Sequence, residues 1–234
     1  MQSASYQQQH YAILYDADRL PRPLLSWFTP EFWSTAELMG GGRGAAWRID
    51  SDWGEAALKR YRRGGWAAPL LGDRYWFRHW HVSRSWSEWR LLAHLAAHNF
   101  PAPTPWAALV ERSGRWSRCA MLSGWIAGSR PLLDVDAAIL QSDQLWRELG
   151  QLVARLAALG VQHVDLNLGN VLRRDDGVLF LIDFDRARWR SRATAPVTPQ
   201  YQRLLRSLRK LQHMGKVDAA LDPRQVAVWL EQGG

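Results

Sequence analysis

Polar side chains around residues 163–185 form the part of the sequence best suited to chemistry. The segment reads HVDLNLGNVLRRDDGVLFLIDFD, in which Asp165 and Asn170 precede a short apolar run and Asp183 follows a second one. The runs NVL and VLFLID, joined by the turn RRDDG, predict a β-hairpin. A hairpin brings both polar groups to one end, where carboxylate and amide oxygens suit a metal ion and phosphate. The alternative is that these side chains only cap turns, as Asp and Asn often do.

Taken together, these residues resemble the catalytic loop and metal loop of the protein-kinase-like superfamily. Asp165 and Asn170 form the pattern H-x-D-x-x-x-x-N, and Asp183 follows Asn170 by thirteen residues in the sequence I-D-F. The resemblance implies an enzyme that moves the γ-phosphate of ATP to a hydroxyl group. Asp165 would accept or orient the hydroxyl proton, and Asn170 and Asp183 would coordinate Mg²⁺. His163 is expected to brace the loop through hydrogen bonds, because Asp165 already fills the role of base.

The N-terminal half contains candidates for contacts to ATP. Gly41, Gly42 and Gly44 belong to a glycine-rich segment whose backbone N–H groups can approach phosphates, although such a cluster is often a simple turn. Lys59 lies on a strand-like run and is the only lysine in the first 209 residues. Its rarity in an arginine-rich chain favours a contact with the ATP phosphates over an ordinary surface position.

The elements that must position these residues begin with strands. Short apolar runs broken by glycine between Tyr11 and Trp80 predict a twisted antiparallel sheet. Apolar residues at three- and four-residue intervals then predict a helix over 85–98. Glu88 lies near the start of this helix, where it could pair with Lys59 or serve as a first-turn acid favoured by the helix dipole.

The C-terminal half is predicted to be mostly helical. A strand is expected over 118–126, a long helix over 136–160 and an amphipathic basic helix over 201–214. With the kinase resemblance, this pattern implies an α+β, two-lobed protein-kinase-like fold. The N-lobe of residues 1–126 would hold the antiparallel sheet, and a reduced C-lobe of residues 127–234 would hold the catalytic and metal loops.

Departures from the protein-kinase pattern narrow the choice of acceptor. Asp185 stands where the metal loop normally has glycine, and Asn167 stands where serine/threonine protein kinases usually have lysine. Only about fifty residues follow Asp185, and they contain no A-P-E sequence. We therefore expect the usual activation segment and most C-terminal helices to be missing. These features favour a small-molecule or glycolipid acceptor over a peptide.

Within that branch, the sequence resembles the 3-deoxy-D-manno-octulosonic acid (Kdo) kinases of Gram-negative bacteria, which are relatives of the lipopolysaccharide heptose kinases. The segments that carry the resemblance are GGRGAA at 41–46, LKRYRRGGW at 58–66, DLN at 165–167, LIDFDRAR at 181–188 and LLRSLRK at 204–210. Position 59 departs from the family, where arginine is common. The resemblance implies transfer of phosphate from ATP to the 4-hydroxyl of Kdo on a lipid A precursor.

The charge of the chain agrees with an acidic lipid-linked acceptor. The net charge is +8, and 27 of the 30 basic residues are arginines, whose planar fork suits phosphates and carboxylates. Fifteen tryptophans suit a lipid headgroup interface, although most should pack in the core. Arg186 and Arg188 follow the metal loop directly and are assigned to acidic groups of the acceptor. The alternative is a generally basic surface without a specific anionic partner.

The same reasoning gives an expected location. The chain has one cysteine, no secretory leader and no apolar stretch of about 18 residues. We expect a cytoplasmic protein that lies peripherally on the inner face of the cell inner membrane and contacts its anionic surface. The helix over 201–214 could lie on that membrane or could pack in the C-lobe with a solvated basic face. We expect no nucleic-acid partner, because no reading motif is present, and no obligate protein partner.

Other functions remain open at this point. The same catalytic residues could phosphorylate heptose or another hydroxylated small molecule such as an aminoglycoside, and only an acceptor screen separates these substrates. A reduced, atypical protein kinase would be recognised by phosphorylation of serine. A kinase-like module without catalysis could bind acidic lipid or nucleic acid through its arginines. Intact Asp165, Asn170 and Asp183 argue against this last class, because a scaffold has no chemical need for all three.

Overall fold

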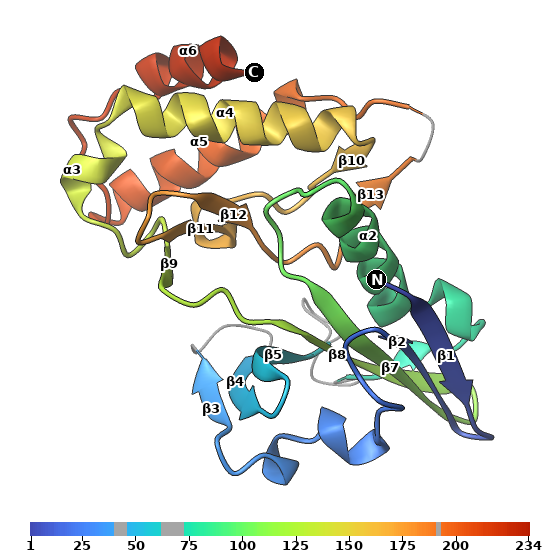
Figure 1. The fold of residues 1–234 in the computed structure, drawn as a ribbon. Coiled ribbons are helices and arrows are strands. Elements are labelled where there is room, and N and C mark those ends of the chain that lie inside the picture. Colours follow the sequence, from blue (N-terminus) through green and yellow to red (C-terminus); the bar gives the residue numbers. More distant parts are fainter. Residues whose placement is uncertain (40–45, 62–72, 191–192) are drawn as a thin grey trace. The chain divides into compact units, whose positions relative to one another are not determined.

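The computed structural model describes residues 1–39, 46–61, 73–190 and 193–234. By their internal contacts these residues form two compact units. Unit 1 comprises Met1–His98 and Pro103–Trp125, and unit 2 comprises Asn99–Ala102 and Ile126–Gly234. An antiparallel sheet dominates unit 1 and helices dominate unit 2, so the predicted α+β fold is confirmed (Figure 1). The predicted lobe boundary at residue 126 stays a prediction.

Unit 1 is built on one antiparallel sheet. In sequence order its described strands are β1 (Ser3–Gln7), β2 (Tyr11–Asp16), β3 (Glu37–Met39), β4 (Ala46–Ser51), β5 (Gly54–Arg60), β6 (Tyr75–Trp76), β7 (Pro105–Ser113) and β8 (Trp116–Gly124). Their order across the sheet is β1-β2-β7-β8-β5-β4-β3, and β6 pairs with β8. The central strands β7 and β8 are almost continuously buried, as expected for strands covered on both faces.

One helix of unit 1, α2 (Arg84–Ala97), packs against β7 and β8. Ser85 Oγ donates a hydrogen bond of 2.8 Å to the Leu109 carbonyl, and Trp86 Nε1 donates one of 3.1 Å to the Ala108 carbonyl. These bonds fix the helix on the sheet and satisfy polar groups that would otherwise be buried without partners. The predicted helix over 85–98 is confirmed within one residue at each end.

One prediction for unit 1 was wrong in detail, and one segment was not assigned. Among the runs between Tyr11 and Trp80 that were expected to form strands, the last, DRYWFRHW at 73–80, pairs only through Tyr75–Trp76, and the 3₁₀ turn η3 (Trp80–Val82) then leads into α2. The segment before β3 was not assigned, and it contains two further 3₁₀ turns, η1 (Leu25–Phe28) and η2 (Pro30–Phe32). Trp27 and Phe28 from this segment join the main hydrophobic core. Tertiary packing, which no local pattern reports, decides these segments.

Unit 2 is mostly helical. Its helices are α3 (Ala137–Leu140), α4 (Asp143–Ala158), α5 (Thr198–His213) and α6 (Pro223–Gly233), with the 3₁₀ turn η4 (Leu168–Asn170). Its strands are β9 (Ser129–Pro131), β10 (Val161–Gln162), β11 (Val171–Arg174), β12 (Leu179–Leu181) and β13 (Arg188–Trp189). They form the small sheets β12-β11-β9 and β10-β13. Among the described helices, none combines the length and apolar content needed to cross a membrane.

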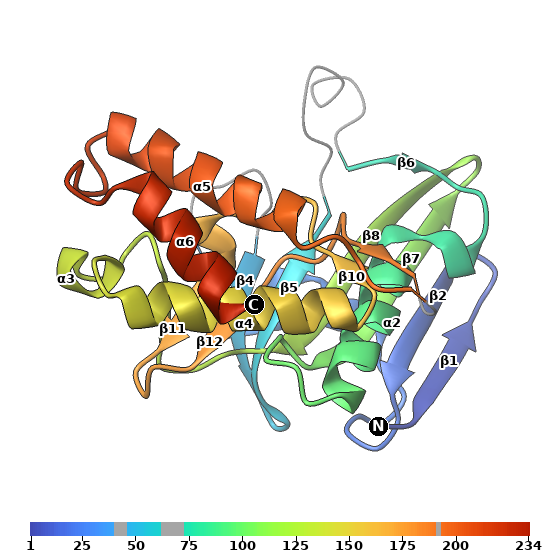
Figure 2. The same cartoon turned by 90° about the horizontal axis from the view of Figure 1, so that it is seen from above.

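Helix α4 is the centre of unit 2. The helix predicted over 136–160 is interrupted, because Ser142 has an extended backbone (φ −73°, ψ 121°) and Asp143 starts a new helix behind it. Helix α6 lies across α4 (Figures 1 and 2). At the crossing, a Cβ atom on Gly150 would overlap the carbonyl oxygen of Leu230. Glycine at position 150 therefore permits the close approach of the two helices.

The predicted hairpin over the catalytic segment is present. Strands β11 and β12 pair antiparallel, with Val171 opposite Leu181, and Gly177 takes a left-handed conformation (φ +91°) in the turn. Strand β9 pairs with the other edge of β11. The hairpin is thus held on one side by β9, which fixes the position of the residues at its ends.

Candidate active site

An ion pair in unit 1 joins Lys59 of β5 to Glu88 of α2. Lys59 Nζ lies 3.3 and 3.2 Å from the two carboxylate oxygens of Glu88. The Lys59 side chain is 23% exposed and that of Glu88 only 3%. The expected pairing is therefore present. The alternative for Glu88 is wrong, because α2 begins at Arg84 and its first turn contains no acidic residue.

Tyr61 completes this group, and sequence reasoning missed it. Its hydroxyl donates a hydrogen bond to Glu88 Oε2 and lies 3.7 Å from Met121 Sδ. The ring is buried, and Lys59 Nζ lies 4.9 Å from its centroid. Alternation along a strand was a usable signal, since residues two positions apart project to the same side. We call Lys59, Tyr61 and Glu88 the lysine cluster.

The interior behind the lysine cluster is buried. The Tyr61 backbone N–H donates a hydrogen bond of 3.1 Å to the carbonyl of Cys119, which is buried. Burial raises the pKa of the Cys119 thiol above its ordinary value of 9.0. In such surroundings a charged pair interacts more strongly than in water, so the orientation of Lys59 is tightly determined.

The glycines assigned to phosphate contacts lie outside the described residues. Gly41, Gly42 and Gly44 fall in the segment that connects β3 to β4. The ends of that segment are defined, because Met39 pairs with Ala46, and Ala46 pairs with Lys59 across β4 and β5. The connection between β3 and β4 therefore begins and ends beside the strand position that carries Lys59.

In unit 2, the hairpin brings Asn170 and Asp183 to one end. Asn170 directly precedes β11 and Asp183 lies two residues beyond β12, while the Ile182 N–H donates a hydrogen bond of 3.0 Å to the Asn170 carbonyl. Asp183 has a left-handed backbone (φ +64°), which is uncommon outside glycine and is often found at functional sites. This is the arrangement that the spacing of the motif predicts.

Side-chain amides hold the loop around Asp165. The Asp165 carbonyl accepts hydrogen bonds from Asn167 Nδ2 at 2.8 Å and from Asn170 Nδ2 at 3.0 Å. Asn167 Oδ1 in turn accepts a bond of 2.9 Å from the Gly169 N–H, which forms an Asx turn. Asn167, to which the sequence assigned no role, therefore shapes the loop. Because Asn170 donates through its nitrogen, its amide oxygen is the atom that can face a cation.

His163 and α5 support the loop from behind. His163 is 1% exposed, and its Nε2 donates a hydrogen bond of 2.9 Å to the Ile182 carbonyl. The His163 N–H donates to Gln200 Oε1 at 2.9 Å, and the Leu168 N–H donates to Ser207 Oγ at 3.2 Å. This geometry agrees with the bracing role expected for His163. Gln200 and Ser207 of α5 were missed, since no local pattern links residues so distant in sequence.

The two arginines assigned to the acceptor differ in position. Arg186 Nη1 lies 3.8 Å from Asp165 Oδ2, and the side chains are 68% and 55% exposed. Such an exposed ion pair is weak, so another anion can replace the Asp165 carboxylate at Arg186. Arg188 is exposed on β13, opposite Gln162 of β10. The structure thus brings Arg186 to the catalytic loop and leaves Arg188 on the neighbouring strand.

The donor set at the end of the hairpin suits a hard divalent cation. Asn170 offers an amide oxygen and Asp183 a carboxylate, and Mg²⁺ prefers oxygen ligands of both kinds. Mg²⁺ usually takes only one or two carboxylates from a protein and completes its octahedron with water and substrate phosphates. A pair of residues therefore fits a cation that bridges the protein and a nucleotide.

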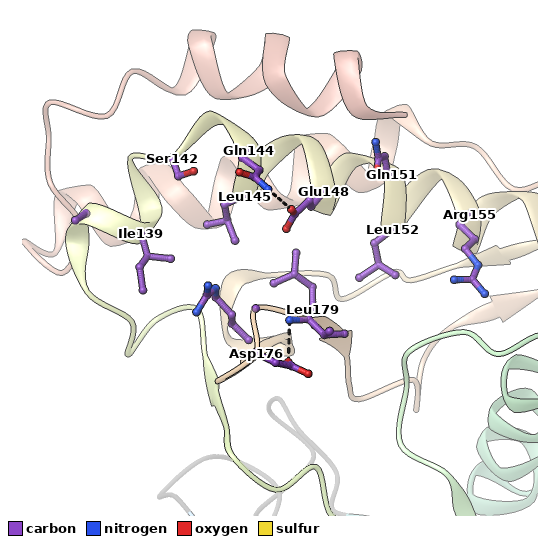
Figure 3. A pocket seen from close by; sticks show the side chains of 14 residues that line it. Ile139, Ser142, Gln144, Leu145, Glu148, Gln151, Leu152, Arg155, Asp176 and Leu179 are labelled. Atoms are coloured by element: carbon purple, nitrogen blue, oxygen red, sulfur yellow. Dashed lines mark hydrogen bonds between the residues drawn. The ribbon is translucent and has the colours of Figure 1, made fainter.

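A separate cavity lies at the other end of the hairpin. It has a volume of about 860 Å³ and lies between α4 and the turn that joins β11 to β12 (Figure 3). Its lining includes Ile139, Leu145, Leu152, Val178 and Leu179, with Gln144, Glu148, Arg155 and Asp176 among the polar groups. Asn170 and Asp183 mark the opposite end of β11 and β12. The cavity is therefore a different region from the loop that carries Asp165.

Comparison with known proteins gives a consistent result. The model of the lipopolysaccharide kinase (Kdo/WaaP) family matches residues 33–223. The 3-deoxy-D-manno-octulosonic acid kinase of Stenotrophomonas maltophilia (strain K279a) is 42% identical over 202 residues, which are 86% of this chain and 81% of that protein. The protein of the same name from Xylella fastidiosa (strain 9a5c) is 37% identical over 210 residues, 89% of this chain and 84% of its own. The matched residues include both the lysine cluster and the catalytic loop.

Proposed function

Because the chain belongs to the lipopolysaccharide kinase (Kdo/WaaP) family, we propose that it transfers the γ-phosphate of ATP to the 4-hydroxyl of Kdo on a lipid A precursor. The reaction belongs to the biosynthesis of the lipopolysaccharide core. The observation that supports it most directly is the hairpin that gathers Asn170 and Asp183 at one end, beside the amide-braced loop of Asp165. The names of the relatives support the choice of acceptor.

In this proposal, Asp165 acts on the acceptor. Its exposed carboxylate accepts or orients the proton of the Kdo hydroxyl, while the hydroxyl oxygen attacks the γ-phosphorus and ADP leaves. Asn170 and Asp183 would hold Mg²⁺, which would neutralise charge on the phosphates when bound. The loop hydrogen bonds from Asn167 and Asn170 keep the Asp165 backbone in place, so the carboxylate needs little rearrangement during the reaction.

The lysine cluster acts on the nucleotide. Glu88 and Tyr61 orient Lys59 toward the α- and β-phosphates of ATP, and the glycines at 41, 42 and 44 contribute backbone N–H groups. A lysine is a point charge with three donors, so its value depends on where it is held. The buried carboxylate of Glu88 supplies that constraint.

The acceptor also sets the location that we propose. Arg186 and Arg188 contact acidic groups of the acceptor, and the protein lies in the cytoplasm, peripherally on the anionic inner face of the inner membrane. We propose that the protein acts without a nucleic-acid partner and without an obligate protein partner. The weak pair between Arg186 and Asp165 supports this assignment, because an incoming anionic substrate can replace the Asp165 carboxylate at Arg186.

The test is transfer of radiolabelled phosphate from ATP to a Kdo–lipid A precursor, with Mg²⁺ present. We expect transfer by the natural protein and by Asp175→Ala, which removes an exposed acid from the hairpin turn, and no transfer by Asp165→Ala. Transfer that survives Asp165→Ala would contradict the mechanism. Transfer to a heptose acceptor but not to Kdo would contradict only the assignment of the acceptor.

A further inference from the structure

The positive charge of the chain is concentrated in one segment. Residues 186–217 contain nine arginines and lysines and no aspartate or glutamate. The other 202 residues contain 21 basic and 22 acidic side chains, a net charge of −1. The excess of basic residues is therefore a property of the segment that follows the metal loop. A diffuse basic surface, the alternative considered from composition, does not describe this distribution.

Helix α5 occupies the middle of that segment and has two different sides. Its apolar side is buried in unit 2 through Tyr201, Leu204, Leu208 and Leu211. The exposed side carries Gln202, Arg206, Arg209, Lys210 and His213, which we call the α5 basic face. The helix contains no acidic residue. In the part of the chain that the structure describes, Arg206, Arg209 and Lys210 form no ion pair, so their charges are available to a partner.

The surroundings of the face suit a lipid surface. Met214, directly after the helix, is 55% exposed. Arginine and lysine are attracted to anionic headgroups. Among the described residues, the apolar stripe of α5 is used for packing, so attraction would be mainly electrostatic and not by insertion of the helix.

We propose that the α5 basic face docks unit 2 on an anionic phospholipid surface. The inference rests on the proposed function, because a lipid-linked acceptor requires the enzyme to work at a bilayer. Charge complementarity favours this partner, since several cations without a counter-charge meet a surface of phosphate groups. Each basic residue near such a surface strengthens binding about fivefold. The absence of a recognisable nucleic-acid-reading motif disfavours the other common polyanion.

The helix that carries the α5 basic face also contacts the catalytic loop. Gln200 and Ser207, on the inner sides of α5, accept hydrogen bonds from the backbone of His163 and Leu168. The same helix therefore holds the loop that carries Asp165 and presents the basic face to solvent. A surface bound at Arg206 and Arg209 is thus held at a fixed distance from the catalytic loop.

The test is co-sedimentation with vesicles, without ATP or acceptor. Vesicles of equal parts phosphatidylglycerol and phosphatidylcholine are compared with vesicles of phosphatidylcholine alone. We expect binding to the anionic vesicles only, and loss of that binding at 1 M salt, where the screening length is about 3 Å. The triple variant Arg206→Gln, Arg209→Gln, Lys210→Gln should lower the partition coefficient on the order of a hundredfold.

A matched control removes the same charge elsewhere. Arg78, Arg112 and Arg115 are exposed in unit 1, and their replacement by Gln should lower the partition coefficient less than tenfold. An equal loss in the two triple variants would show binding by net charge and would overturn the proposal. Stronger binding to a DNA duplex than to anionic vesicles would overturn the choice of partner. The variant Arg206→Lys, Arg209→Lys should keep the binding, and thermal unfolding checks that each variant is folded.

The assay separates this inference from the proposed function. Vesicle binding with no phosphate transfer to Kdo would contradict the proposed function and leave the α5 basic face supported. Transfer to Kdo in detergent, together with equal vesicle binding by the natural protein and the α5 variant, would contradict only the docking surface.

Discussion

The two units hold the charged residues of the candidate site in opposite ways. In unit 1, Glu88 is buried and held by Lys59 and Tyr61. In unit 2, Asp165 and Asp183 are exposed, and hydrogen bonds act on the backbone around them and on neighbouring amides. A residue that orients a nucleotide phosphate is held more firmly in position when its own partner is rigid and desolvated. Residues that meet an acceptor or a cation must stay open to them.

This difference predicts which variants lose activity alone and which also lose stability. Charges that are buried and paired contribute to folding, so removal of one partner leaves the other uncompensated. Exposed carboxylates contribute little to folding and can be changed at small cost. The variants below test this division, from the largest effect to the smallest.

Asp183→Asn should have the largest effect on activity. Loss of the carboxylate weakens the proposed Mg²⁺ site, and a bound metal ion would supply several kcal/mol of charge stabilisation, so kcat should fall on the order of a thousandfold. Asparagine tolerates the left-handed backbone at this position (φ +64°), so the thermal midpoint should stay within about 2 °C. Steady-state kinetics and thermal unfolding measure the two effects. A large loss of stability with little loss of activity would reverse the role assigned to Asp183.

Glu88→Gln should reduce both activity and stability. It removes the buried negative charge that pairs with Lys59, which should lower the free energy of unfolding by about 3 kcal/mol. The kcat/KM for ATP should fall roughly ten- to a hundredfold, because Lys59 is no longer oriented. Urea unfolding and ATP kinetics provide the measurements. If stability falls and the ATP kinetics do not change, the ion pair serves only the fold.

Tyr61→Phe should give a smaller effect of the same kind. It removes the hydrogen bond to the Glu88 carboxylate but keeps the ring, at a cost of about 2 kcal/mol in unfolding free energy. The KM for ATP should rise several-fold, with a smaller change in kcat. The matched control is Tyr201→Phe, which removes a buried hydroxyl that donates to the Gly150 carbonyl in unit 2. It should lower stability without changing the KM for ATP, and equal KM changes in both variants would argue against a positioning role for Tyr61.

Cys119→Ala should change the pH dependence of stability, because the Cys119 thiol is buried. Burial raises the pKa of the thiol, so the folded chain keeps its proton when the unfolded chain loses it. Stability of the natural protein should therefore decline as pH rises above about 9, by less than about 1.4 kcal/mol per pH unit from this group. Urea midpoints at pH 8, 9 and 10 should decline less in the variant. Parallel declines would mean that the Cys119 thiol does not differ between the folded and unfolded chains.

The parts of the site that the sequence predicted are those that local chemistry determines. Asp165, Asn170 and Asp183 belong to one loop and one hairpin, so turn residues and apolar runs place them without reference to the rest of the chain. Lys59 and Glu88 are farther apart, and the prediction of their pair depended on the resemblance to the kinase pattern, while the rarity of lysine favoured a phosphate contact for Lys59. The alternation of side chains along the strand also points to Tyr61, two positions beyond Lys59.

The parts that were missed depend on packing between distant segments. Gln200 and Ser207 meet the catalytic loop only after α5 has packed into unit 2, and no spacing rule anticipates such contacts. The interruption of the predicted long helix at Ser142 also lacks a strong local signal, since apolar spacing continues through it. Strands β1 and β7 were not predicted, because their place in the sheet depends on neighbours far along the chain.

The two-sided character of α5 has a consequence for kinetics. One side of the helix fastens the catalytic loop and the other presents cations. An enzyme held at a bilayer through such a helix searches for its lipid acceptor by lateral diffusion in two dimensions. Its rate should then follow the mole fraction of acceptor in the surface, and added neutral lipid should slow turnover by dilution even when the total amount of acceptor is unchanged.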